Sequence, residues 1–84
     1  MNILSLYLII EKMQYKFLGK YIKSKREKAG VSLNSFSITN DIEPAILSRI
    51  ENLHQNIKLN VLEKIAKGFN QTPAQFLLEF EQTD

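Results

Sequence analysis

The stretch from residue 32 to residue 51, SLNSFSITNDIEPAILSRIE, constrains the fold of this chain more than any other. Ser32 is a suitable N-cap for a short helix, and Asn40 and Asp41 supply the residue types of a tight turn. Pro44 fits the first turn of a second helix, where its missing N–H has no helical partner to lose. The apolar positions that let the two helices close on one another are Phe36, Ile42, Leu47 and Ile50. Two helices that cross steeply over a short turn are one way in which small proteins present a helix to the major groove of DNA.

Three further helical segments flank this pair. Apolar residues recur at helical spacing over about residues 14–29, and Gly30 follows the last turn. A second pattern covers 59–69, which Asn70 ends in the left-handed conformation, and TPAQ at 72–75 combines a capping box with a proline at the first helical position. The apolar residues at helical spacing are Phe17, Leu18, Tyr21, Ile22 and Ala29, then Leu59, Leu62, Ile65, Ala66 and Phe69, and the last helix carries Phe76, Leu77 and Phe80. The chain is therefore predicted to be all-α, with five short helices.

Composition argues against catalysis. The 84 residues include no cysteine and a single histidine, His54, so neither a disulfide nor a Cys- or His-based metal cluster is expected. The sequence has no glycine-rich phosphate loop and no histidine–carboxylate spacing of the kind that catalysis requires. We therefore expect no enzymatic activity, no cofactor and no metal, and the lack of cysteine suits a cytoplasmic protein.

Basic residues gather toward the N-terminal part of the chain. Seven of the eleven Lys and Arg residues lie between Lys12 and Lys28, although the net charge is only +2. Such an asymmetry can orient a protein on a polyanion, whereas the alternative is a solvated helix face. Lys20, Lys23 and Lys25 are expected to add only long-range attraction.

The N-terminal segment NILSLYLII, residues 2–10, is unusually apolar. It is far shorter than the roughly 20 residues of a membrane span, and it lacks the flanks of a signal peptide, so no membrane association is expected. Two interpretations remain open: an upstream translation start with Met13 opening the domain, or an arm or strand that pairs with a second subunit. We accordingly divide the chain into an extension, 1–13, and a domain, 14–84.

From Leu18 to Leu77 the chain resembles the helix-turn-helix family of phage lambda-type repressors and Cro proteins, the XRE family. The segments that carry the resemblance are LGKYIKSKREKAGVS, DIEPAILSRIE and NIKLNVLEKIAKGFNQTP, and the last is also similar to small controller proteins of restriction–modification systems. The resemblance implies a five-helix lambda-repressor-like domain with its helix-turn-helix at the second and third helices. It also implies a partly buried structural ion pair between Arg26 and Glu51.

Outward positions on the second helix of the motif are the candidates for base readout. These are Glu43, Ala45, Ile46, Ser48 and Arg49. Arg49 is the only one that can bind guanine in a bidentate manner, and Ala45 and Ile46 can meet thymine methyls. The alternatives for Arg49 are a phosphate clamp or an ion pair with Glu43 or Glu51. Glu43 is expected to repel phosphates.

Phosphate contacts are predicted at two places, the N-terminus of the first motif helix and the loop after the second. The residues are Ser32, Leu33, Asn34, Asn52, Gln55, Asn56 and Lys58. Free N–H groups at a helix N-terminus attract anions. Leu33 stands where the family commonly has a glutamine.

A homodimer is expected because one domain of this size covers too little of the groove for specificity, whereas two half-sites lie about 34 Å apart. Leu77 and Phe80 are predicted to share in the interface, and the alternative is that they pack internally with Phe76.

Two functions follow as hypotheses. The first is a sequence-specific transcriptional regulator, a repressor or autoregulator that binds a palindromic operator in double-stranded DNA as a homodimer. The alternative is an antitoxin-like or adaptor module on the same fold, which binds a protein partner and only weakly DNA.

Overall fold

The computed structural model describes residues 2–4, 15–53 and 55–82, and within them the chain is helical, without strands. Five helices follow in order: α2 (Tyr15–Lys28), α3 (Leu33–Thr39), α4 (Pro44–Asn52), α5 (Leu59–Gly68) and α6 (Pro73–Glu81). The prediction of an all-α chain with five short helices is confirmed for this part of the sequence. The extension proposed for residues 1–13, with its alternative start at Met13, lies largely outside the described residues.

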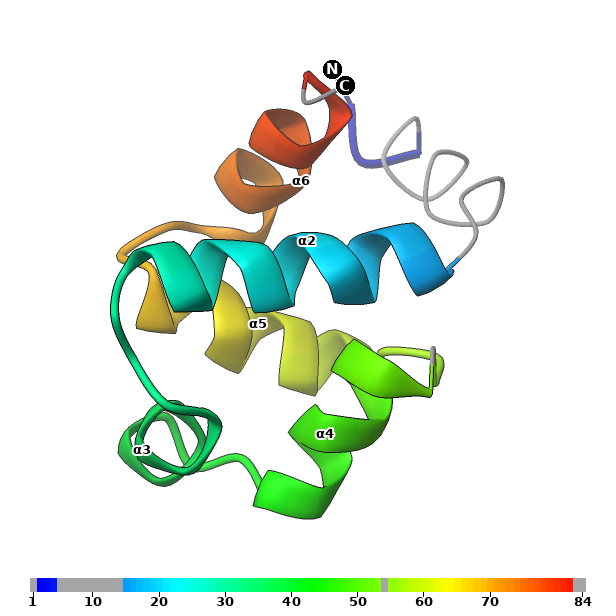
Figure 1. Cartoon of the computed structure of the whole chain (residues 1–84). Helices are drawn as coiled ribbons and strands as arrows, with labels where there is room; N and C mark the ends of the chain where they lie inside the picture. The colour runs from blue at the N-terminus through cyan, green and yellow to red at the C-terminus, as the bar shows by residue number, and fades with distance from the viewer. Residues whose placement is uncertain (1, 5–14, 54, 83–84) are drawn as a thin grey trace.

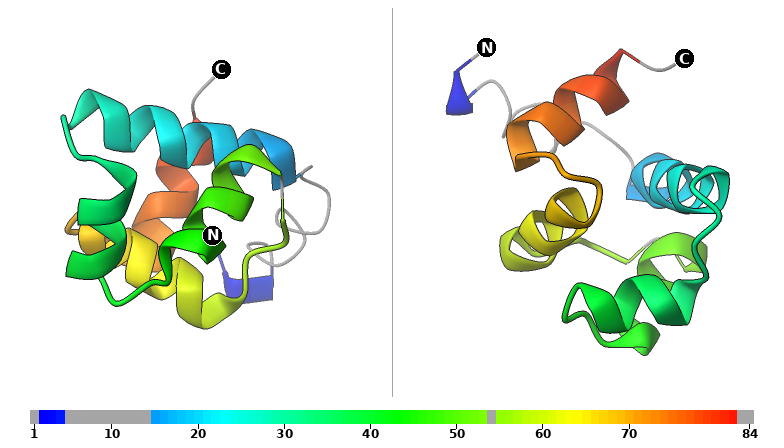
Figure 2. Two further views of the ribbon diagram at one scale, coloured as in Figure 1. Left: turned by 60° about the horizontal axis from the view of Figure 1, so that its bottom comes forward. Right: turned by 90° about the vertical axis from the view of Figure 1, so that its left-hand side faces the viewer.

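The helices surround one core. Figures 1 and 2 show α2 and α5 on opposite sides of it, with α6 at one end and the α3–α4 pair at the other. The buried apolar side chains are Leu18, Ile22, Phe36, Ile42, Leu47, Ile50, Leu62, Ile65, Ala66, Phe76, Leu77 and Phe80. Each of the five described helices contributes at least one residue to this list. The helices are therefore stabilised by packing against one another and not by local preference alone.

The helix starts follow the local signals in the sequence. Ser32 caps α3, its side chain accepting a hydrogen bond from the backbone N–H of Ser35 at 3.1 Å. Thr72 and Gln75 form the predicted capping box at the start of α6, with hydrogen bonds of 3.1 and 2.8 Å. Pro44 occupies the first turn of α4, as expected. These caps satisfy backbone donors that have no partner within the helix.

Three residues in the left-handed region end helices. Gly30 follows α2 with φ of 74°, Asp41 follows α3 with φ of 57°, and Asn70 follows α5 with φ of 60°. After Asp41 the chain reverses so that the Ile42 N–H donates to the Ser37 carbonyl at 2.8 Å. The two predicted helix ends at Gly30 and Asn70 are confirmed, and Asp41 is tolerated in this conformation because its short polar side chain suits it.

Three of the apolar residues that recur at helical spacing are exposed. Phe17 and Leu59 are each 52% exposed, and Ala29 is also exposed. Phe17 lies about 100° around α2 from Leu18, which faces the core. Leu59 is the first residue of α5, and Ala29 lies past the last turn of α2. A position near the end of a helix can follow the helical period and still lie outside the core.

The last helix is held against α2 by rings and by a polar network. Tyr21 contacts the rings of Phe76 and Phe80, at centroid distances of 5.6 and 5.1 Å. Its hydroxyl donates to Glu79 Oε2 at 2.6 Å, and Lys25 Nζ donates to the same oxygen at 2.7 Å. These hydrogen bonds lower the pKa of Glu79 to about 2, that from Lys25 contributing most.

Leu77 and Phe80, which we predicted at a dimer interface, are 4% and 8% exposed in the single chain. They pack internally beside Phe76, which is fully buried. Only a small part of either side chain remains exposed for contact with a second subunit. Most of their surface is buried by packing within the single chain, which is the alternative stated above.

Replacing Gly19 with alanine is expected to destabilise the fold. A Cβ at this position would collide with the Ile50 carbonyl, a backbone atom of α4 that cannot rotate away. We expect Gly19→Ala to lower the free energy of unfolding by about 1–3 kcal/mol, despite the better helix propensity of alanine. Urea denaturation followed by circular dichroism measures this. Lys20→Ala, on the exposed side of the same helix, should change it by less than about 0.5 kcal/mol. A Gly19→Ala protein as stable as the parent would contradict the close α2–α4 contact.

The network at Glu79 predicts an acid-dependent loss of stability. Since the pKa of Glu79 falls from 4.5 to about 2 on folding, its contribution is complete above pH 4.5 and disappears as the pH falls toward 2. The urea midpoint of the parent should therefore exceed that of Glu79→Gln at about pH 6, and the gap should narrow between about pH 4.5 and 2. Solvent screening limits its size, because the side chain is 43% exposed. Glu63→Gln, which removes an exposed carboxylate from α5, serves as the control. A gap that is constant over this range would count against the network.

Candidate nucleic-acid interface

The α3–α4 pair closes as the apolar spacing predicts. Phe36 on α3, Ile42 in the turn, and Leu47 and Ile50 on α4 are all at most 5% exposed. Ser37, midway along α3, is fully buried, and its hydroxyl donates to the Leu33 carbonyl at 2.7 Å. A small residue with its own internal partner lets the helices approach closely without an unsatisfied polar group.

One buried ion pair fixes this unit to α2. Arg26 donates through Nε to Glu51 Oε2 and through Nη2 to Glu51 Oε1, both at 2.9 Å. The two side chains are 7% and 0% exposed. The hydrogen bonds that Arg26 donates to Glu51 raise the pKa of Arg26, against the opposing effect of burial. The structure thus brings together the pair that the family resemblance implies.

Arg26 makes a third contact that sequence reasoning missed. Its Nη1 donates to the Val31 carbonyl at 2.6 Å, in the loop that leads into α3. One guanidinium therefore lies between the residues that precede the N-terminus of α3 and the C-terminal turn of α4. Both of the places predicted to contact phosphate adjoin these segments. No local pattern signals this bond, because it depends on the path of the loop.

The predicted base-readout residues lie on α4 or at its start. Glu43, Ala45 and Arg49 are exposed, whereas Ser48 is half-buried. Ile46 is also half-buried and packs against the core, so less of it is available to a thymine methyl. Glu43 is the N-cap of α4 but makes no capping hydrogen bond with its side chain.

Glu51 is not a partner for Arg49. Both of its carboxylate oxygens bind Arg26, and the side chain is fully buried. Within the part of the chain that the structure describes, Arg49 forms no ion pair with Glu43 either. The guanidinium of Arg49 therefore projects from the last turn of α4 without a carboxylate partner among these residues.

The predicted phosphate contacts fall into two groups. At the N-terminus of α3, Ser32 and Asn34 are exposed, and Leu33 is half-buried against the core. At the C-terminal end of α4 and in the loop after it, the exposed members are Asn52, Gln55, Asn56 and Lys58. His54, to which we gave no role, lies outside the described residues. The side chain of Leu33 packs inward, so this position can offer only its backbone N–H.

The lysines of α2 differ sharply in their surroundings. Lys25 is bound to Glu79 at 2.7 Å and lies over the ring of Phe69, 5.2 Å from its centroid. Lys23 instead donates to Asn52 Oδ1 on α4 at 3.1 Å, and Lys20 is exposed. The spacing of the three lysines in the sequence predicts the same role for each of them. Their surroundings differ because each meets different neighbours in the folded chain.

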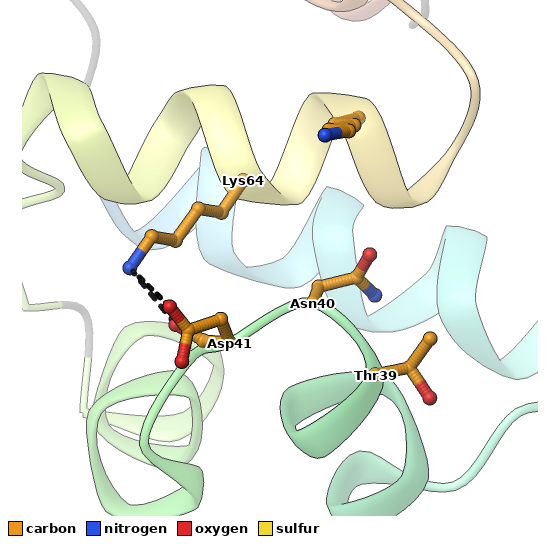
Figure 3. A pocket seen from close by; sticks show the side chains of 5 residues that line it. Thr39, Asn40, Asp41 and Lys64 are labelled. Atoms are coloured by element: carbon orange, nitrogen blue, oxygen red, sulfur yellow. Dashed lines mark hydrogen bonds and ion pairs between the residues drawn. The ribbon is translucent and has the colours of Figure 1, made fainter.

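A shallow hollow lies on another side of α3, between its C-terminal end and α5. Thr39, Asn40, Asp41, Lys64 and Lys67 line it (Figure 3). Lys64 Nζ donates to the Asp41 carbonyl at 2.9 Å and lies 3.6 Å from its carboxylate. This contact ties the turn to α5, and it involves none of the residues predicted to bind DNA.

Two properties of the described residues bear on other classes of function. No group of three or more His, Cys, Asp or Glu residues within them is arranged to hold a metal ion. None of the described helices is long and apolar enough to cross a membrane.

The fold and this interface define a small helical protein built around two helices that meet at a tight turn. The chain is similar to the Control protein C.MunI of a Mycoplasma species, with 31% identity over 70 residues. The similarity covers 83% of this chain and 95% of that protein. No family model matches the chain, and no solved structure matches it. On this identity and coverage, the chain belongs to the family of the control protein C.MunI.

Breaking the buried ion pair is expected to be costly. Arg26→Met leaves the Glu51 carboxylate buried without a partner, so the free energy of unfolding should fall by about 3–5 kcal/mol. Lys64→Met breaks the exposed bond to Asp41 and should cost less than about 1 kcal/mol. Urea denaturation of both variants gives the comparison.

The double variant Arg26→Met/Glu51→Leu provides a further check. It removes both charges and should be more stable than Arg26→Met alone, because no unpaired charge remains. An Arg26→Met protein that loses no more stability than Lys64→Met would show that the pair does not hold the unit together.

Proposed function

We propose that this chain is a small DNA-binding transcriptional regulator, a repressor or autoregulator without enzymatic activity. The observation that carries the proposal is the similarity to a control protein over most of both chains. The helix pair supports it: α3 and α4 meet over a tight turn and leave the outer face of α4 exposed. We further propose that the five helices form a lambda-repressor-like domain of the XRE type.

In this proposal α4 enters the major groove with its N-terminal half foremost. Ala45 contacts a thymine methyl, and Arg49 donates to a guanine. Arg49 is available for this contact because it forms no ion pair with a carboxylate among the described residues. The two phosphate-binding groups flank α4, at the N-terminus of α3 and in the loop after α4. Arg26 keeps them at a fixed separation, because it contacts both adjoining segments.

We also propose that the protein acts as a homodimer on a palindromic operator. The argument is one of size: a radius of gyration of 11.9 Å limits one protomer to a single groove. A second half-site about 34 Å away supplies the remaining specificity. Leu77 and Phe80 have little exposed surface to offer, so an interface on α6 would need its neighbouring residues as well.

A second candidate function is a module that binds a protein partner. Two observations favour it: Glu43 places a carboxylate at the start of α4, and Ile38 on α3 is 74% exposed. An acidic and apolar surface is better suited to a protein than to phosphates. Co-purification of a stoichiometric partner, together with weak binding to DNA, would favour this alternative.

The proposed function is tested by fluorescence anisotropy with two duplexes, one from the region upstream of the coding sequence and one scrambled. We expect tighter binding to the upstream duplex, at two protomers per duplex. Arg49→Ala should weaken that binding by about 1–3 kcal/mol, with a smaller effect on the scrambled duplex. Glu63→Ala on α5 is the control and should leave both affinities unchanged. Equal, weak binding to both duplexes would contradict a sequence-specific regulator.

A further inference from the structure

A chain of hydrogen bonds connects α2 to the C-terminal end of α4. Lys23 Nζ donates to Asn52 Oδ1 at 3.1 Å. The amide nitrogen of Asn52 donates in turn to the Ser48 carbonyl at 3.1 Å, with a longer contact of 3.4 Å to the Ser48 hydroxyl. Both ends of the Asn52 amide are therefore engaged, and the orientation of this side chain is set by α4. Lys23 is consequently held at a defined place rather than free on the surface of α2.

The ammonium of Lys23 has hydrogen-bonding capacity to spare. An ammonium carries three N–H donors, and the bond to Asn52 uses one of them. The carboxylate that lies nearest along α4, Glu51, is fully buried and occupied by Arg26. Lys25, two residues further along α2, is by contrast paired with Glu79 at 2.7 Å. Lys23 thus keeps its positive charge unneutralised by any ion pair among the described residues.

The position of this ammonium coincides with a predicted phosphate site. Asn52 is one of the residues predicted to contact phosphate, and two others, Gln55 and Asn56, follow it closely in the chain and are exposed. In Figures 1 and 2, α2 and the C-terminal end of α4 lie side by side, so Lys23 adds a charge from a second helix to this segment. A fixed cation beside neutral amides is the arrangement that anchors a phosphate oxygen, since amides orient the anion and the cation neutralises it.

We propose that Lys23 binds a DNA phosphate directly and that Asn52 is its positioning residue. This inference rests on the proposed function and deepens it, because it moves Lys23 from long-range attraction to a specific contact. Phosphate contacts of this kind fix the register of a protein on the duplex and carry no sequence information themselves. The contact would therefore be made on any duplex that the protein binds.

The test uses the full chain and a mixed-sequence duplex of about 25 base pairs, with anisotropy titrations at several salt concentrations. For each protomer, Lys23→Gln should reduce the slope of log affinity against log salt by about 0.9. We expect a loss of affinity of about three- to tenfold at the lowest salt concentration. Lys67→Gln removes the same charge from α5 and should leave the slope within error of the parent. Circular dichroism melting establishes that each variant is folded.

The role of Asn52 is tested by combining substitutions. Asn52→Ala should reduce the slope as Lys23→Gln does, and the double variant should lose no more than Lys23→Gln alone, because both act through one contact. If the double variant lost affinity by the product of the two single-variant losses, the positioning role of Asn52 would be overturned. A Lys23→Gln slope equal to that of Lys67→Gln, with the parent binding DNA normally, would overturn the inference alone. A parent protein that binds no duplex at any salt concentration would overturn the proposed function as well.

Discussion

The contacts of the Arg26 guanidinium are the constraint on which the rest of the structure depends. A single cation joins α2, the loop before α3 and the last turn of α4, through Val31 and both oxygens of Glu51. Burial of a charge is unfavourable unless its hydrogen-bonding groups are satisfied, and here the neighbours satisfy them. The geometry is therefore specific: moving any one of the three segments would leave a buried donor or acceptor without a partner.

The dependence is greatest for α3, which is only seven residues long. A helix of this length is not stable alone, and its Ser, Asn and Thr residues compete with the backbone for hydrogen bonds. It forms because Ser32 caps it, Phe36 is buried in the core, and the turn at Asp41 is tied to Lys64 on α5. Tertiary contacts at both ends thus supply what local preference lacks.

The difference between local signals and tertiary contacts explains which features could be predicted from the sequence. Helix ends depend on neighbouring residues, so Gly30, Asn70 and the Thr72 capping box could be read directly and were confirmed. The exposure of Leu59 could not be predicted in this way, because it depends on whether another helix covers the first turn of α5. The resemblance brought Arg26 and Glu51 to attention, but the bond from Arg26 to Val31 depends on the path of a loop and has no counterpart in the spacing of residues.

The lysines show most clearly why the candidate site could be predicted only in part. A long, flexible side chain samples a wide region, so its position in the sequence does not determine which partner it meets. Lys25 reaches Glu79 and Lys64 reaches Asp41, and each pairing reduces the charge offered to a polyanion. Lys23 meets the neutral amide of Asn52 and keeps its charge. The net charge of +2 therefore says little about affinity for DNA. Affinity for DNA depends instead on which cations lack a carboxylate partner and on where the fold positions those cations.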